Sequence, residues 1–238
     1  IFGEGIMSIE LKNVFYTYMA KTPFEHLALD DISLTIPEGK VTAIAGHTGS
    51  GKSTLLNMLA GLEKPTKGEV IIAGEHIEKM NEAKLVKFRQ QHIGFIFQSY
   101  NLLPTMDAID NVALPLMFQG IGKEERRDRA KKMLAHVGLS KYMEHKPTQM
   151  SGGQQQRVGI ARALVVKPEI IFADEPTGNL DSNTTMDVLH LLQEIVLKQN
   201  QTLVMVTHDD HLAHFANCLI HIKDGKIEYI EENEPITE

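Results

Sequence analysis

The chain has 238 residues, 42% of them hydrophobic, and a formal net charge of −7. This length suits one domain with a small inserted subdomain, and the acidic balance argues against electrostatic binding of DNA or RNA. No apolar run approaches the roughly 20 residues of a membrane span, and the single cysteine, Cys218, excludes an internal disulfide and favours a reducing, cytosolic compartment.

Two strands are predicted near the start of the chain. Residues 1–6 precede Met7, and we expect them to be foreign to the native protein. Polar and apolar residues alternate over 8–18 and again over 27–36, which is typical of half-buried strands. A turn-like stretch with Pro23 separates them, so we expect a small antiparallel sheet.

A glycine-rich loop then joins a buried strand, 41–45, to a helical pattern that ends at Gly61. The loop reads G-x-x-x-x-G-K-S, and its glycines let successive backbone N–H groups point at a phosphate beside a helix N-terminus. Lys52 can reach the β- and γ-phosphates, and the hydroxyl of Ser53 suits Mg²⁺. The chain is therefore predicted to bind a nucleoside triphosphate, with contacts from Gly46, His47, Thr48, Gly49, Ser50, Gly51, Lys52, Ser53 and Thr54.

Two tyrosines lie one strand upstream of this loop. An aromatic ring there could stack on a purine base, a contact that contributes about 1 kcal/mol. The alternative is ordinary packing within the strand. We assign packing to Tyr16 and base stacking to Tyr18.

A hairpin, a short helix and another buried strand follow the loop. The hairpin spans 69–77 with Gly74 at its tip, the polar helix spans 81–91, and the strand spans 93–97 with Gln98 at its end. Ligands bind at the carboxyl ends of strands in doubly wound sheets. Because most loop glutamines are merely solvated, the residues alone leave a ligand role for Gln98 open.

The pattern turns helical from residue 99 to about 166. A helix over 123–137 carries charges of both signs, which indicates a solvated face rather than a binding patch. A second helix opens with Ser151, Gly152, Gly153 and Gln154, a start that suits a phosphate. Read alone, that start is simply a well-capped helix.

Two adjacent carboxylates follow the next buried strand, 169–173. Side chains alternate along a strand, so we expect Asp174 and Glu175 to point to opposite sides and to have different roles. Asp174 would hold Mg²⁺, and Glu175 would polarise the attacking water. A polar strand cap is the alternative, which the phosphate loop upstream makes less favourable.

The last part of the chain returns to the pattern of helix and strand. A helix runs from 179–181 to about 199, and a buried strand spans 202–206. His208 lies just beyond that strand; a lone histidine is usually structural, but this position makes it a candidate for γ-phosphate contact. A hairpin around Asp224 and Gly225 follows, and the acidic tail from Glu231 is expected to fray.

Together these motifs resemble those of the ATP-binding subunits of ABC transporters, over nearly the whole chain. The signature reads MSGGQ rather than the commoner LSGGQ. The resemblance implies that Ser151 faces a γ-phosphate bound by a partner subunit, which revises the capped-helix interpretation. The matching elements are Walker A (46–53), Walker B (170–174), the catalytic Glu175, the Q-loop residue Gln98, the signature (Ser151, Gly152, Gly153 and Gln154), the D-loop ending at Asp181, the switch residue His208 and the adenine-stacking Tyr18.

The resemblance implies an α/β fold: a P-loop NTPase (RecA-like) core with an antiparallel β subdomain and an inserted helical subdomain. The whole chain, 1–238, would be one ABC ATPase domain, with the core and β subdomain at about 7–98 and 167–230 and the helical subdomain at about 99–166. A head-to-tail homodimer would sandwich two ATP molecules with Mg²⁺ held by Ser53, Gln98 and Asp174. An integral membrane permease would dock near Gln98–Asn111, placing the chain in the cytoplasm on the inner face of the membrane.

The resemblance also indicates a branch of the family. Residues 101–121 and 145–164 resemble ATPases of macrolide export, lipoprotein release and antimicrobial-peptide export, whereas TPFEH and GHTGSGKST are similar to energy-coupling-factor uptake ATPases. The longer match favours export. A signal-transmitting complex of the cell-division type stays open as an alternative; a DNA-repair or chromosome ATPase does not fit, because no long insertion separates Walker A from the signature.

Overall fold

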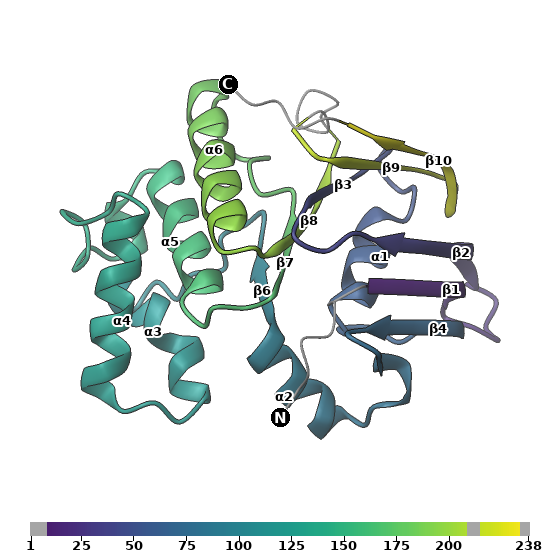
Figure 1. Cartoon of the computed structure of the whole chain (residues 1–238), viewed down its shortest axis with the longest axis horizontal. Helices are drawn as coiled ribbons and strands as arrows, with labels where there is room; N and C mark the ends of the chain where they lie inside the picture. The colour runs from purple at the N-terminus through teal and green to yellow at the C-terminus, as the bar shows by residue number, and fades with distance from the viewer. Residues whose placement is uncertain (1–8, 209–214, 234–238) are drawn as a thin grey trace.

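A computed structural model describes residues 9–208 and 215–233 and contains two sheets (Figure 1). The larger sheet has six strands in the order β10-β9-β3-β8-β7-β6; neighbours pair in parallel except β9 and β10. Its strands are β3 (Val41–Ala45), β6 (Ile93–Ile96), β7 (Ile170–Asp174), β8 (Thr202–Thr207), β9 (Cys218–Lys223) and β10 (Lys226–Glu232).

The smaller sheet is antiparallel, with strand order β2-β1-β4-β5, as the alternating pattern predicts. Its strands are β1 (Ile9–Tyr18), β2 (His26–Ile36), β4 (Lys67–Ile72) and β5 (Glu75–His76). The turn between β4 and β5 contains Gly74, whose φ of 77° is left-handed. The predicted tip of this hairpin is therefore confirmed.

The helices fall into two groups. α1 (Lys52–Leu59) and α2 (Glu82–His92) follow the phosphate loop and the β4–β5 hairpin, and Asn81 caps α2 by accepting a hydrogen bond from the backbone N–H of Lys84. The others are α3 (Ala108–Phe118), α4 (Lys123–His136), α5 (Gly152–Leu164) and α6 (Ser182–Lys198), with short 3₁₀ helices η1 (Ile77–Lys79) and η2 (Pro147–Gln149).

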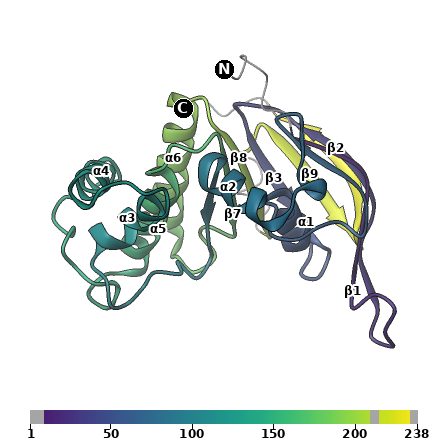
Figure 2. The ribbon, with the colours of Figure 1, turned by 90° about the horizontal axis from the view of Figure 1, so that it is seen from below.

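The parallel sheet is buried on both faces. Along β7, Ile170 and Phe172 pack with α1 and the antiparallel sheet, whereas Ile171 and Ala173 pack with α5 and α6. This alternation follows from the two-residue period of a strand, and burial on both faces explains why the strand is continuously apolar. The sheet therefore separates α1 from α5, as both views show (Figure 1 and Figure 2).

The C-terminal hairpin extends further than predicted. β10 continues to Glu232, and Glu231 and Glu232 pair with Leu219 and Cys218 of β9. The expectation that the chain frays from Glu231 is wrong for these two residues, because the backbone ladder continues opposite a buried strand. Residues 234–238 lie outside the described part of the chain.

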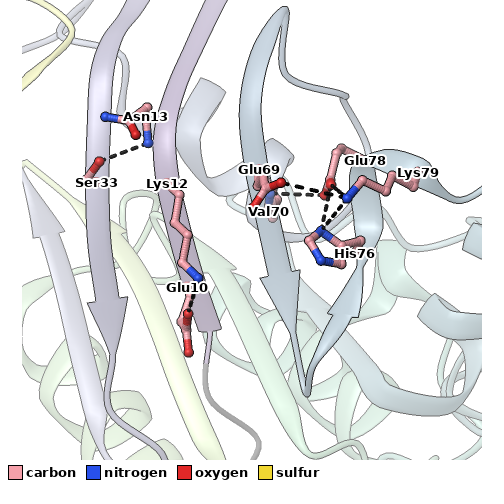
Figure 3. A network of polar contacts seen from close by, with 9 residues as sticks. All are labelled: Glu10, Lys12, Asn13, Ser33, Glu69, Val70, His76, Glu78 and Lys79. Atoms are coloured by element: carbon pink, nitrogen blue, oxygen red, sulfur yellow. Dashed lines mark hydrogen bonds and ion pairs between the residues drawn. The ribbon is translucent and has the colours of Figure 1, made fainter.

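A polar cluster joins β4, β5 and η1 on the antiparallel sheet (Figure 3). Oxygen and nitrogen atoms of Glu69, His76 and Glu78 lie within 4.8 Å of one another, a spacing that could hold a metal ion. However, the ammonium of Lys79 lies 3.7 Å from each carboxylate and 3.3 Å from Nδ1 of His76. The cluster thus already contains its own cation, and it fastens the edge of the sheet.

No helix within the described ranges is both long enough and apolar enough to cross a bilayer.

Candidate functional site

The loop between β3 and α1 takes backbone conformations that require glycine. Gly49 and Gly51 have φ of 82° and 103°, in the left-handed region. A Cβ on Gly51 would lie 2.7 Å from the carbonyl oxygen of Ala28, and one on Gly46 would lie 2.1 Å from that of Ile222. Both distances are shorter than any ordinary van der Waals contact, so side chains are excluded at Gly46 and Gly51. The left-handed φ angles confirm the predicted curl of the loop backbone.

The C-terminal hairpin supports this loop. The backbone N–H of Gly225 donates to the carbonyl of Ser50 at 3.0 Å, and the carbonyl of Gly225 accepts from the N–H of Asp30 at 2.8 Å. Strand β2 and the β9–β10 turn therefore hold the loop from outside. Sequence reasoning placed a turn at Gly225 but gave no sign that it touches the phosphate loop.

Lys52 is folded back onto its own loop. Its buried ammonium donates to the carbonyl oxygens of Gly46 and His47, at 2.8 Å each. Burial lowers the pKa of Lys52, while the negative charges of Glu175 and Asp174 act in the opposite direction. The amine is thus placed at the centre of the loop, with acceptors that a phosphate could replace.

Ser53 and Asp174 meet across the loop and the end of β7, with Oγ of Ser53 3.4 Å from Oδ1 of Asp174. Burial raises the pKa of Asp174, and so does the neighbouring Glu175; the hydrogen bond from Ser53 and the charge of Lys52 oppose the rise. A hydroxyl and a partly desolvated carboxylate are hard oxygen donors, which Mg²⁺ prefers. The donor set of this structure therefore fits that ion.

Glu175 departs from the predicted geometry. β7 ends at Asp174, and Glu175 has a left-handed φ of 43°, so strand alternation does not determine where its side chain points. The basis of the expectation of opposite sides, that Glu175 lies on the strand, is therefore wrong, and both carboxylates act on Lys52. Oε1 of Glu175 lies 3.0 Å from Nδ1 of His208, which follows β8.

Gln98 lies beside Glu175. A Cβ on Gly178 would come within 2.9 Å of Nε2 of Gln98 and 3.3 Å of Oε2 of Glu175, so both side chains lie against this glycine. The backbone carbonyl of Gln98 accepts a hydrogen bond from the side chain of Asn179 at 2.9 Å. The structure thus brings the ends of β6, β7 and β8 together as predicted for a ligand site.

A cavity of about 310 Å³ opens over the loop. The hydroxyl of Tyr18 lies 3.0 Å from Oγ1 of Thr54 at the start of α1. Tyr16 packs against the core instead, and its ring meets that of Tyr18 edge-on at 4.8 Å. Burial raises the pKa of Tyr16 to about 12, assisted by Glu63, which agrees with its packing role. The cavity is lined by Tyr18, His26, Ala28, Thr48, Gly49, Gly51, Lys52, Ser53, Thr54 and Glu175.

The segment from Ser151 to Gln154 lies elsewhere. Ser151 caps α5 in a reciprocal arrangement: its Oγ accepts from the N–H of Gln154 at 3.3 Å, and the Gln154 side chain accepts from the N–H of Ser151 at 3.0 Å. A Cβ on Gly153 would lie 2.5 Å from the Thr184 side chain. Among the described residues that line the cavity, none comes from 99–166. Ser151 therefore does not line the cavity over the phosphate loop of its own chain.

Asp181 has a clear local role at the start of α6. Its carboxylate accepts from the backbone N–H of Thr184 at 3.1 Å and from the Thr184 hydroxyl at 2.7 Å, which caps the helix. Sequence reasoning did not identify His26, a cavity residue opposite Tyr18 on the neighbouring strand. No sequence motif marks it.

Comparison with known proteins gives consistent results. The family described as ABC transporter matches residues 29–178. The chain is 48% identical to an ABC transporter ATP-binding protein of Thermotoga maritima over 204 residues, which are 86% of this chain and 87% of that protein. It is also 48% identical over 205 residues to the macrolide export ATP-binding/permease protein MacB of Shewanella sp. (strain ANA-3), of which it spans only 31%.

A solved structure agrees with the fold. The dimeric structure of a post-hydrolysis state of the ATP-binding cassette MJ0796, bound to ADP and Pi, matches with a TM-score of 0.88 and 43% identity. The match covers 96% of this chain and 100% of that one.

Proposed function

Because the chain belongs to the ATP-binding, ATP-hydrolysing subunits of ABC transporters, we propose that its ATP hydrolysis drives export or extraction of a substrate through a separate membrane permease. Its likeness to MacB, whose name joins an ATP-binding part to a permease, supports a membrane partner. The observation that carries the proposal is the convergence of Lys52, Ser53 and Glu175 at one cavity, with Asp174 3.4 Å from Ser53.

Residues in and beside the cavity have proposed parts in binding. Tyr18 stacks on the adenine from the position that its bond to Thr54 fixes. The backbone N–H groups of 46–54 face the phosphates, and the Lys52 ammonium exchanges its two carbonyl acceptors for β- and γ-phosphate oxygens. Ser53, Gln98 and Asp174 would hold Mg²⁺, which neutralises phosphate charge when bound.

The proposed chemistry is attack of water on the γ-phosphorus; the bond from this phosphorus to the β–γ bridging oxygen breaks, and ADP leaves with that oxygen while inorganic phosphate forms. Glu175 lies in the cavity wall and accepts the proton of the water, and His208 orients the carboxylate through their 3.0 Å contact. The negative charge of Glu175 also acts on Lys52, so binding and proton transfer share one electrostatic environment.

The proposed active form is a head-to-tail homodimer. Each site would pair the 46–54 loop of one chain with Ser151, Gly152, Gly153 and Gln154 of the other, and Asp181 would lie near the shared interface. The position of Ser151 outside its own cavity supports this arrangement, as do the dimeric structures of similar cassettes. A helix start with two glycines and an exposed serine suits the terminal phosphate of a partner's nucleotide.

The permease would dock near Gln98–Asn111, with the chain peripheral to the inner face of the membrane. Exposed apolar side chains in and beside this region support the position: Leu103, Met117 and Phe118 are 40%, 41% and 63% exposed. Because this segment follows Gln98 directly, a movement of Gln98 on hydrolysis of the γ-phosphate would also move the residues that contact the permease.

Mixing two inactive variants tests the shared site. Lys52→Ala should disable phosphate binding, and Ser151→Arg should block the contact from the opposite chain, so each variant alone should be nearly inactive. A mixed dimer has one doubly damaged site and one intact site. With free exchange of chains and independent sites, mixing should restore roughly a quarter of wild-type hydrolysis, as two-fold symmetry implies.

The matched control is Ser140→Arg, the same change at an exposed serine of the same helical region, which should keep full activity. If the two sites are only partly coupled, the recovery will be smaller than a quarter but still above either parent. If mixing restores nothing, each chain uses its own Ser151 and the head-to-tail arrangement is wrong.

A further inference from the structure

Helix α5 holds the segment that follows Gln98. Arg162, near the C-terminal end of this helix, donates from Nη2 to the carbonyl of Tyr100 at 2.8 Å and from Nη1 to the carbonyl of Asn101. Its guanidinium also lies 5.9 Å from the centre of the Phe97 ring. One side chain thus contacts residues before and after Gln98 (residues 97, 100 and 101).

The held segment has a strained backbone. Tyr100 and Asn101 are consecutive non-glycine residues with left-handed φ of 58° and 48°. Asparagine visits this conformation as a single residue but tyrosine rarely does, and two such residues in succession persist only where the surroundings enforce it. The two carbonyls that Arg162 binds belong to these same two residues. Burial lowers the pKa of Arg162, so its guanidinium is partly withdrawn from water.

The same helix holds a second segment of the site. The buried Gln156 donates from Nε2 to the carbonyl of Pro176, the residue after Glu175. Gln98 and Glu175 in turn meet against Gly178. Helix α5 therefore fastens both strand-end segments that carry these side chains, and Ser151 caps its N-terminus.

We propose that Arg162 is a positioning residue for Gln98: it fixes the left-handed turn at Tyr100 and Asn101, and so ties the helix that starts at Ser151 to the nucleotide site of its own chain. The proposal rests on the proposed role of Gln98 in hydrolysis. In the dimer, α5 of each chain would contact the partner's nucleotide through Ser151. Through Arg162, the same helix would also contact the segment around Gln98, at the nucleotide site of its own chain.

Amide hydrogen exchange tests the turn without reference to activity. Arg162→Ala should speed exchange in residues 97–102 of the full chain. Arg157→Ala is the matched control, because Arg157 on the same helix donates to one carbonyl, that of Val137 at 3.2 Å, away from Gln98. It should leave exchange in 97–102 unchanged.

Hydrolysis tests the connection to Gln98. Loss of a residue that orients a metal-binding side chain typically costs roughly 10–100-fold in activity or metal affinity. Arg162→Ala should lower kcat in this range and raise the Mg²⁺ concentration for half-maximal rate, with ATP binding in the absence of Mg²⁺ unchanged. Arg162→Lys keeps the positive charge but not the forked geometry of the guanidinium, so its kcat should lie between those of the wild type and Arg162→Ala.

A double-mutant cycle with Gln98→Ala completes the experiment. If Arg162 acts through Gln98, the double variant should lose little more kcat than Gln98→Ala alone. If the two substitutions act independently, the fold-losses in kcat of the two single variants should multiply in the double variant. Unchanged exchange in 97–102, or multiplicative effects, would overturn the positioning role. Wild-type turnover in Gln98→Ala alone would instead refute the proposed role of Gln98. This result is distinguishable both from unchanged exchange and from multiplicative effects.

Discussion

At the scale of single residues, the site places the carboxylates of Asp174 and Glu175 next to each other, an arrangement that does not stabilise the fold. Asp174 is drawn toward neutrality by burial and by Glu175, and only Ser53 and Lys52 compensate. The folded chain therefore holds the Asp174 proton more tightly than an unfolded chain would, and stability is lost as pH rises through the raised pKa. Such a carboxylate is more useful to a bound cation than to the fold.

We therefore expect Asp174→Asn to stabilise the nucleotide-free protein while impairing Mg²⁺-dependent hydrolysis. Because Asp174 is only half-buried, solvent screening limits the gain to about 1 kcal/mol or less. That corresponds to a rise of at most about 4 °C in Tm for a domain of this size. Thermal unfolding without nucleotide measures it.

The pH dependence provides the check. The advantage of Asp174→Asn over wild type should be smallest at acidic pH, where Asp174 is protonated in both the folded and the unfolded chain, and should grow as pH rises through the raised pKa of Asp174. An advantage that is constant with pH would mean that packing, rather than charge, causes the stabilisation.

At the scale of elements, the phosphate loop depends on a hairpin far away in the sequence. The β9–β10 turn donates to the loop through Gly225, and a Cβ on Gly225 would lie 2.8 Å from the carbonyl of Ala28 in β2. The last hairpin thus holds the loop and β2 at a fixed spacing.

Gly225→Ala should disturb this contact in a measurable way. A Cβ in the left-handed region costs roughly 1–2 kcal/mol of stability, and here it also pushes against Ala28. Displacement of the loop should weaken ATP binding about tenfold, equivalent to about 1.4 kcal/mol. Calorimetric titration measures the affinity.

Gly74→Ala is a closely matched control. Gly74 has φ of 77° against 76° for Gly225, but a Cβ there would meet nothing within 4 Å. It should show the conformational cost without the loss of ATP affinity. Equal affinities in the two variants would mean that the hairpin does not support the loop.

The same elements show what the sequence could and could not predict. Hydrophobic periodicity and glycine positions predicted the strands and the helices α1, α2, α4, α5 and α6, because each follows from local pattern, whereas the fold class was inferred from the resemblance to ABC transporter ATP-binding subunits. The left-handed backbones of Tyr100 and Glu175 were missed, since these residue types rarely adopt this conformation without tertiary contacts that enforce it. That of Asn101 was missed because asparagine tolerates the conformation but does not require it. The contact between Gly225 and Ser50 was missed because no local signal records which distant turn fills a space.

At the scale of the whole molecule, the parallel sheet separates α1, which follows the phosphate loop, from α5, which follows Ser151 (Figure 2). If hydrolysis opens the sandwich, a variant that binds but cannot hydrolyse should stay closed. Glu175→Gln should lower turnover by about 10²–10⁴-fold, the usual effect of losing a general base. With ATP it should elute as a dimer in size-exclusion chromatography.

Glu169→Gln offers the same change at the other end of β7, where Glu169 contacts His92 on the surface at 3.1 Å. It should hydrolyse ATP normally and elute as wild type does. Near-normal turnover in Glu175→Gln would remove the catalytic role of that residue.

The placement of Ser151 across the sheet from the loop has a consequence for kinetics. In the proposed sandwich the working enzyme is a pair of chains, so in dilute solution the rate should follow second-order dependence on chain concentration, and halving the concentration should cut it about fourfold. A partner that tethers two copies raises their effective concentration toward the millimolar range. Chains that are not bound to such a partner would then hydrolyse almost no ATP, and hydrolysis would begin only when the partner brings two chains together.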